Sequence, residues 1–152
     1  MTDMEKVKIH GVPETMMQTL FARAAHSQKK EHKFYDAKAI EIVKQLDYDF
    51  SKAEKDAAMS SGVIARTILL DQMVGAFLEE HPDATVVNIA CGLDTRVYRL
   101  DNGQVRWYNL DLPETIAIRN QIFAGPAGGD RHPAAFSERT WAYLHDRQVR
   151  YG

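Results

Sequence analysis

The sequence predicts an α/β protein in which a helical N-terminal cap precedes a partial Rossmann-like core. Two short runs rich in β-branched and aromatic residues, 85–90 and 105–110, are typical of strands in a parallel sheet, and the first reads as buried. Apolar residues at helical spacing precede, separate and follow these runs. Strands that alternate with helical segments are the pattern of a doubly wound fold.

Composition narrows the class of protein. The chain has 152 residues, which is the material of one domain, with 45% apolar and 26% charged residues. It carries 19 basic and 21 acidic residues, a formal net charge of −2. Proteins that bind nucleic acid usually carry a basic excess, so we expect no nucleic-acid partner.

The apolar runs, the N-terminus and the cysteine count indicate the cellular compartment and the metal content of the protein. No apolar run approaches the roughly 18–20 residues that span a bilayer, and the N-terminus shows no apolar signal segment, so we expect no membrane association. The single cysteine, Cys91, allows no internal disulfide and no cysteine-rich zinc site. We therefore expect a cytoplasmic protein without a metal centre.

Residues 1–57 are predicted to form the helical cap. Pro13 and Glu14 are typical of a helix start, and the apolar residues from 16 to 24 lie on one helical stripe. A second helix is expected over 36–46, followed by a turn with two aromatic anchors at 48–51. The apolar face of this second helix is expected to comprise Ala39, Ile40, Val43 and Leu46.

Residues 58–123 are predicted to form the first part of the core. A helix is expected over 61–80 and ends before Pro82. The first strand leads into a loop at Gly92, a helical turn follows over 95–100, and the second strand ends at Asp111, after which Pro113 opens another helix. The residues expected on the buried face of the 61–80 helix are Ile64, Ile68, Met73 or Val74, Phe77 and Leu78.

Residues 124–152 are predicted to form an irregular tail. They begin with a stretch rich in Gly and Pro and contain few aliphatic residues. One short amphipathic helix is compatible with the aromatic residues of this segment, but no strand pattern is present.

The spacing of Gly92 and Asp111 indicates a nucleoside-binding unit. In doubly wound folds, ligands bind beyond the carboxyl ends of the strands. A glycine there lets a ligand approach the backbone, and a carboxylate at the end of the next strand, about 20 residues on, accepts hydrogen bonds from ribose hydroxyls. The alternative is a structural turn glycine and an aspartate that caps the helix at Pro113.

The loop favours a cofactor without phosphates. It holds one glycine between Ile89 and Asp94, whereas a dinucleotide-binding loop needs more glycines and free amides for the pyrophosphate. The residues therefore favour S-adenosylmethionine over a dinucleotide. A dehydrogenase-type domain remains a weaker alternative, and the chain has no P-loop motif.

These residues also carry a family resemblance. Residues 86–96 read VVNIACGLDTR, and residues 107–114 read WYNLDLPE. Together with GVPET at 11–15, DYDF at 47–50 and ART at 65–67, they resemble the leucine carboxyl methyltransferase family. The similarity is greatest to its bacterial branch of O-methyltransferases from polyketide synthesis, and it covers roughly residues 7–123.

The resemblance implies a class I S-adenosylmethionine-dependent methyltransferase and places its cofactor contacts. The family's glycine loop, here with Ala90 in place of a frequent glycine and with Gly92, holds the methionine part of the cofactor. Asp111 is placed at the ribose and Arg66 at the cofactor carboxylate, which a guanidinium can grip with two bonds. A basic residue of the N-terminal helix near the cofactor corresponds to Arg23.

Two functions follow from the resemblance and the chain length. The first is an O-methyltransferase that acts on a carboxyl or hydroxyl group of a small, polyketide-like metabolite. The family needs a seven-stranded sheet in a chain about twice as long, and only two strands are predicted here. The alternative is therefore a truncated, non-catalytic remnant that self-associates through an open sheet edge. No catalytic base is assigned.

Four further features have structural explanations that we favour. Cys91 is expected to be a buried small hydrophobe rather than a reactive thiol. The scattered histidines are expected at the surface, and Asp94 is expected to pair with Arg96 and fix the loop. The charged run 29–33 is expected to be a solvated link, with contact to an anionic substrate as the alternative.

Overall fold

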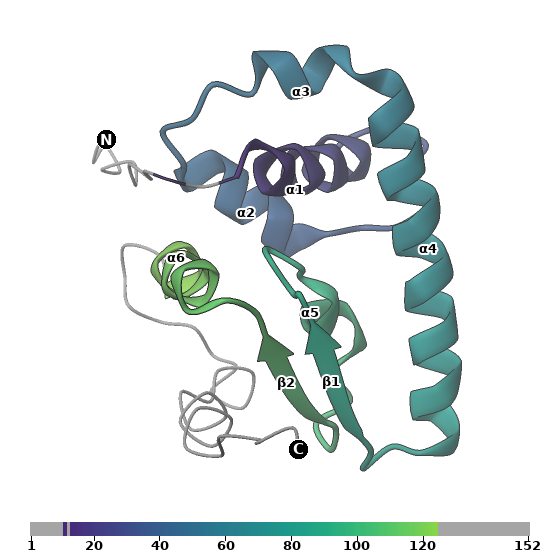
Figure 1. Cartoon of the computed structure of the whole chain (residues 1–152). Helices are drawn as coiled ribbons and strands as arrows, with labels where there is room; N and C mark the ends of the chain where they lie inside the picture. Colours follow the sequence, from purple (N-terminus) through teal and green to yellow (C-terminus); the bar gives the residue numbers. More distant parts are fainter. Residues whose placement is uncertain (1–10, 12, 125–152) are drawn as a thin grey trace, which may run out of the picture.

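A computed structural model describes residues 11 and 13–124 (Figure 1). The described part contains two parallel strands and six helices. The carboxyl ends of both strands point toward helices α1 and α2 (Figure 1). In chain order the elements are α1 (Glu14–Ser27), α2 (Ala37–Gln45), α3 (Ser51–Lys55), α4 (Ala57–Glu80), β1 (Thr85–Ile89), α5 (Arg96–Leu100), β2 (Arg106–Leu110) and α6 (Pro113–Ala124).

The two strands pair in parallel over their whole length. Thr85 lies opposite Arg106, and Ile89 lies opposite Leu110. A further backbone bond forms two residues beyond β1, where the amide of Cys91 donates to the carbonyl of Leu110 at 3.1 Å. This extra bond brings the loop that follows β1 next to the loop that follows β2, at the edge where ligands bind in such folds.

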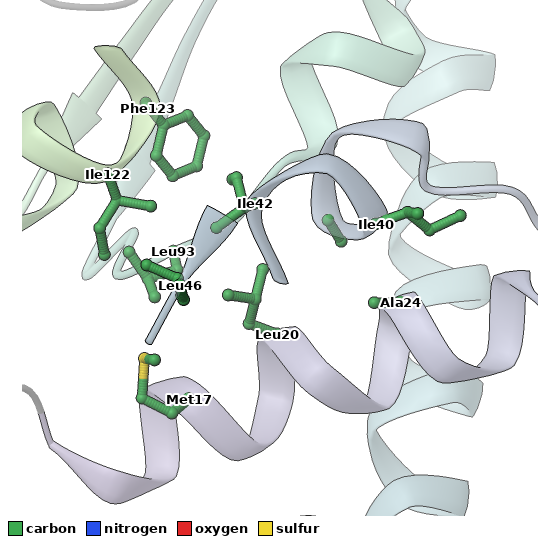
Figure 2. Packing of buried hydrophobic residues seen from close by; sticks show 10 residues of the cluster. Met17, Leu20, Ala24, Ile40, Ile42, Leu46, Leu93, Ile122 and Phe123 are labelled. Atoms are coloured by element: carbon green, nitrogen blue, oxygen red, sulfur yellow. The ribbon is translucent and has the colours of Figure 1, made fainter. Parts of the chain in front are cut away.

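The main hydrophobic core joins the N-terminal helices to the sheet region. Three surfaces meet in it: one face of α1, one face of α2, and residues from the loop after β1 and from α6 (Figure 2). Its buried members are Met17, Leu20, Ala24, Ala39, Ile40, Ile42, Leu46, Leu93, Ile122 and Phe123.

Between residues 13 and 124 the predicted elements are confirmed, with small shifts at their ends. The predicted irregular tail lies outside the described residues, except for Ala124, which ends α6. Asp36 caps α2 through its carboxylate, which accepts from the amide of Ala39 at 2.9 Å. On the same helix, Ile42 is more deeply buried than the predicted Val43. Phe50 anchors the predicted turn by stacking on Phe21, with ring centroids 5.0 Å apart. The short helix α3 was not predicted, because five residues are too few to establish a helical period.

The predicted buried face of the 61–80 helix is wrong in part. α4 buries Leu78 as expected, but its other two buried residues are Val63 and Thr67. Met73 and Phe77 are 60% and 51% exposed. Among the described elements α4 packs mainly against α1 and α5, which leaves one apolar stripe of this helix uncovered.

The predicted burial of the first strand is also wrong in the described structure. Side chains alternate along β1, and those of Val87 and Ile89 are 50% and 76% exposed. No described element covers this face of the strand. Each strand also has only one strand neighbour, so β1 keeps one unpaired edge within the described residues.

One expectation about apolar segments needs correction. By length and composition alone, α4 is apolar enough to cross a membrane, with a mean hydropathy of 1.3 in its best window. The prediction from the sequence was that no apolar run approaches this length. The helix nevertheless contains Asp71, which forms ion pairs with Arg96 and Arg99 of α5 and ties the helix to the rest of the protein.

Candidate cofactor site

The loop after β1 contains two residues in the left-handed region. Ala90 has a φ of 55° and Gly92 a φ of 48°. A Cβ at Gly92 would meet Met16 of α1 at 3.7 Å, an ordinary contact, so the backbone conformation rather than space requires glycine there. Ala90 adopts the same conformation with a methyl group and therefore carries backbone strain.

The peptide groups of Gly92 are held from two sides. Its amide donates to Oδ2 of Asp111 at 2.8 Å, and its carbonyl accepts from Nη1 of Arg119 at 2.9 Å. Asp111 follows β2 and Arg119 lies in α6, so both contacts come from elements that follow the loop in the chain. Hydrogen bonds to charged groups are the stronger kind, so these two fix the loop conformation.

Arg119 is fully buried beneath the loop. Its guanidinium lies 4.0 Å from the ring centroid of Phe123, one turn further along α6. Burial lowers the pKa of Arg119, although nearby acidic groups such as Asp94 act in the opposite direction. The ring face offers this cation a favourable contact where water cannot reach.

Arg23 joins α1 to the same loop. Its Nη2 donates to the carbonyl of Leu93 at 2.7 Å, its Nε to Oδ2 of Asp36 at 3.1 Å, and its Nη1 to the carbonyl of Thr19 at 3.2 Å. Burial lowers the pKa of Arg23, and the charge of Asp36 partly offsets this effect. The contacts therefore make Arg23 a clamp between the cap and the loop.

Asp36 is the centre of this clamp. The carboxylate is fully buried and its Oδ2 accepts from Arg23, from Arg99 at 2.9 Å and from the hydroxyl of Thr95. Its Oδ1 caps α2. A buried carboxylate is stable only when its charge is paired and hydrogen bonded, and both conditions hold here.

A second set of ion pairs fixes the other side of the loop. Asp94 accepts from the amide side chain of Asn88 at 2.8 Å and from Nη1 of Arg96 at 2.7 Å, which confirms the predicted pair. Arg96 also donates through Nε to Asp71 of α4 at 2.8 Å, and Arg99 donates to both oxygens of Asp71. The loop is thus tied to α4 as well as to α1.

A cavity of about 400 Å³ lies between α1, α4 and this loop. The α1 wall includes Arg23 and the α4 wall includes Arg66. The loop supplies Ala90, Gly92 and the residues between and after them. This volume falls within the range of about 300–1,000 Å³ that small-molecule sites occupy.

Arg66 is the accessible cation of this cavity. It is exposed, and it makes no hydrogen bond or ion pair with any other residue in the described part of the chain. The neighbouring Arg23 and Arg96 are engaged with protein groups. A carboxylate that entered the cavity would therefore find Arg66 available for a bidentate contact.

The structure brings four of the five predicted cofactor residues to one cavity. Arg23, Arg66, Ala90 and Gly92 all line it. Asp111 lies beside the loop instead, with Oδ2 on the amide of Gly92 and Oδ1 on the amide of Leu112 at 2.8 Å. Each of these oxygens retains a second lone pair for another donor.

Sequence reasoning missed the residues that hold the loop. Asp36, Asp71 and Arg119 fall within expected helices, and the sequence predicts no role for them in the site. A sequence signal exists for Asp36 as a helix cap, but nothing local marks its burial or its two arginine partners. Arg119 interrupts an otherwise apolar helix face, and such an interruption is a signal for a buried polar contact.

Cys91 is confirmed as a buried residue. It is 5% exposed, and burial raises the pKa of its thiol to about 11. A thiol that stays protonated at neutral pH is a poor nucleophile, which supports the structural reading.

Comparison with known proteins identifies the family. Residues 16–138 match the sequence model described as "Leucine carboxyl methyltransferase". The chain belongs to the leucine carboxyl methyltransferase family. The match ends at residue 138, whereas we expected the resemblance to end near residue 123; residues 125–138 lie outside the described part. The family is Rossmann-like, which agrees with the parallel strands and flanking helices.

Two curated relatives of this leucine carboxyl methyltransferase family member are similar over most of its length. It is 35% identical over 138 residues to the tetracenomycin polyketide synthesis O-methyltransferase TcmP of Streptomyces glaucescens. The aligned stretch covers 90% of this chain and 51% of the relative. It is 35% identical over 135 residues to the S-adenosyl-L-methionine-dependent methyltransferase dpfgK of Gibberella zeae, covering 82% and 45%. The chain spans about half the length of these relatives.

Proposed function

We propose that this chain is the cofactor-binding part of an S-adenosylmethionine-dependent O-methyltransferase. The observation that carries the proposal is the available guanidinium of Arg66 in a small-molecule cavity beside a loop with a positive-φ glycine. Membership of the family supports it, as do the names of the two relatives, both of which are methyltransferases.

The residues present fit this cofactor. Arg66 would hold the carboxylate of its methionine part, and the backbone at Ala90 and Gly92 would pass close to that part. Asp111 would accept from the ribose hydroxyls with the lone pairs that its two backbone contacts leave. Arg23 would act indirectly, because its donors keep α1 and Leu93 in place beside the cavity.

The chemistry demands positioning more than protein nucleophiles. The bound cofactor supplies an electrophilic methyl group on a sulfonium. The chain's own task is to hold the cofactor in one orientation and to exclude water. The clamped loop and the cap helix α1 contribute to both of these tasks. A carboxylate acceptor needs no general base, and we assign none.

The acceptor that we propose is a carboxyl or hydroxyl group of a small metabolite. The name of TcmP places that relative in polyketide synthesis, which favours a polyketide-like acceptor here. We also propose that the chain works in the cytoplasm, without a nucleic-acid partner and without a membrane.

Self-association is a second proposal for this chain. It rests on β1, which keeps one unpaired edge and exposes Val87 and Ile89 within the described structure. Such an edge can pair with another chain. The remnant reading is not favoured by the comparisons, so we propose self-association as a property of the chain and not as its function.

A calorimetric titration with S-adenosylmethionine tests the cofactor proposal. We expect saturable binding by the chain and a loss of about tenfold or more in affinity for Arg66→Gln and for Asp111→Asn, because each removes a charge-assisted contact. Arg106→Gln is the control, since Arg106 is an exposed arginine on β2 that contacts Thr85. Unchanged affinity in both site variants would refute the site assignment.

A further inference from the structure

A second and larger cavity lies on the other side of the contact between α1 and α4. Its volume is about 670 Å³, and α3 closes one side of it. None of its lining residues lines the cofactor cavity. The cofactor site therefore leaves this space unexplained.

The floor of this cavity is apolar. Phe21 and Ala22 of α1 face it, and Ile64 and Ile68 of α4 complete it. A volume and floor of this kind suit a ligand with a ring system or a branched hydrocarbon body, because burial of that body is the main favourable term.

The rim of the cavity is basic. Lys29 and Lys33 come from the exposed link between α1 and α2, and neither forms an ion pair with any described acidic residue. Glu54 on α3 is the acidic residue among the lining side chains. Two lysines against one glutamate leave an excess of one positive charge at the mouth, close to the apolar floor.

His26 of α1 also lines the cavity and is held in place. Its Nε2 accepts from the amide of Lys33 at 2.9 Å, and its ring stacks on Phe34 with centroids 5.1 Å apart. Burial and the charges of Lys29, His32 and Lys33 lower its pKa. The ring therefore offers a neutral, flat surface at the mouth and reports on any change of charge there.

We propose that this cavity is a second binding site, for a small organic anion that combines an apolar ring or branched chain with one carboxylate. The body would lie on the floor formed by α1 and α4, and the carboxylate would lie between Lys29 and Lys33. The charged link 29–33 would then bind the carboxylate of the ligand and would not be only a solvated connection. The site is separate from the cofactor cavity and does not depend on the function proposed for it.

Matched probes separate the two parts of this proposal. We would titrate the chain with 2-naphthoate and with 2-naphthylmethanol, which share the ring system and differ in charge. We expect saturable 1:1 binding of naphthoate and weaker binding of the alcohol. Each of Lys29→Gln and Lys33→Gln should weaken naphthoate binding by about two- to fivefold, the range of exposed ion pairs, and leave the alcohol unchanged.

Two controls locate the site. Lys30→Gln removes a charge from the same link at a residue that does not line the cavity, and should bind naphthoate as the wild type does. Arg66→Gln should do the same, which separates this site from the cofactor site. In an NMR titration the pKa of His26 should be higher with naphthoate bound than with the alcohol bound. Both ligands shield the ring from water to the same extent, but only the carboxylate offsets the charges of Lys29, His32 and Lys33.

Four results would overturn the proposal. They are the absence of saturable naphthoate binding, equal affinity for naphthoate and the alcohol, equal losses in Lys30→Gln and the two rim variants, and a His26 pKa that is the same with naphthoate and with the alcohol bound. The first would mean that the cavity does not accept a small molecule. The others would mean that its basic rim does not select an anion.

Discussion

Replacement of Asp36 tests whether the buried ion pairs join the cap to the cofactor loop. Asp36 and Asp56 cap their helices in the same way, each accepting from the amide three residues on at 2.9 Å. Asp36 alone is fully buried and also holds two arginines and Thr95. The two substitutions Asp36→Ala and Asp56→Ala therefore share the loss of a cap and differ in the loss of the buried pairs.

The magnitude follows from these contacts. Loss of an exposed cap, as in Asp56→Ala, should cost about 1 kcal/mol. Asp36→Ala also leaves the buried guanidinium of Arg23 without its carboxylate, and breaking a buried pair in this way costs about 3–5 kcal/mol. Arg99 keeps Asp71 as a partner, which limits the loss. We therefore expect Asp36→Ala to lower the free energy of unfolding by about 2–4 kcal/mol more than Asp56→Ala does.

Urea unfolding followed by circular dichroism measures this difference. Asp36→Asn, which keeps the shape and the cap, serves as an intermediate if Asp36→Ala does not fold. It should be more destabilised than Asp56→Ala. Equal losses for Asp36→Ala and Asp56→Ala would refute the view that a buried charge network holds the cap on the loop.

Three further predictions concern single residues. Ala90→Gly should raise the free energy of unfolding by about 0.5–1 kcal/mol, because relief of left-handed strain exceeds the entropy cost. Ala117→Gly on the exposed face of α6 should instead lower it by about 1 kcal/mol. Loss of stability at both positions in urea unfolding would contradict this prediction. The thiol pKa of about 11 exceeds the unfolded value of 9.0, so stability should fall between pH 9 and 11 more steeply in the wild type than in Cys91→Ala; parallel pH profiles would argue against it. Ile89→Lys should reduce self-association in sedimentation velocity, while Tyr35→Lys, at another exposed site, should not. Equal self-association of the two variants would exclude the β1 edge as the contact between chains.

The sequence was sufficient for elements and motifs that depend on local patterns. Pro13 and Pro113 mark helix starts, and the loop at Gly92 is recognisable because a glycine follows a run of β-branched residues. The pairing of Asp94 with Arg96 is also local, since the two residues are only two positions apart. Such features need no knowledge of distant contacts.

The contacts that hold the site depend on packing between distant segments. Arg119 reaches Gly92 across 27 positions, and Arg23 reaches Leu93 across 70. The apolar pattern of α4 likewise indicates a face that can be buried, but not which residues cover it. Phe77 therefore looks like a core residue in the sequence and is half exposed in the described structure.

The function that we propose depends on Arg66 binding the carboxylate of S-adenosylmethionine in the cavity between α1, α4 and the glycine loop. The most direct measurement is calorimetric titration of the wild type and Arg66→Gln with two ligands, S-adenosylmethionine and 5′-methylthioadenosine, which lacks the amino-acid part. We predict that Arg66→Gln weakens binding of S-adenosylmethionine by about tenfold or more and leaves binding of 5′-methylthioadenosine unchanged. An equal loss for both ligands, or no loss for either, would contradict the claim.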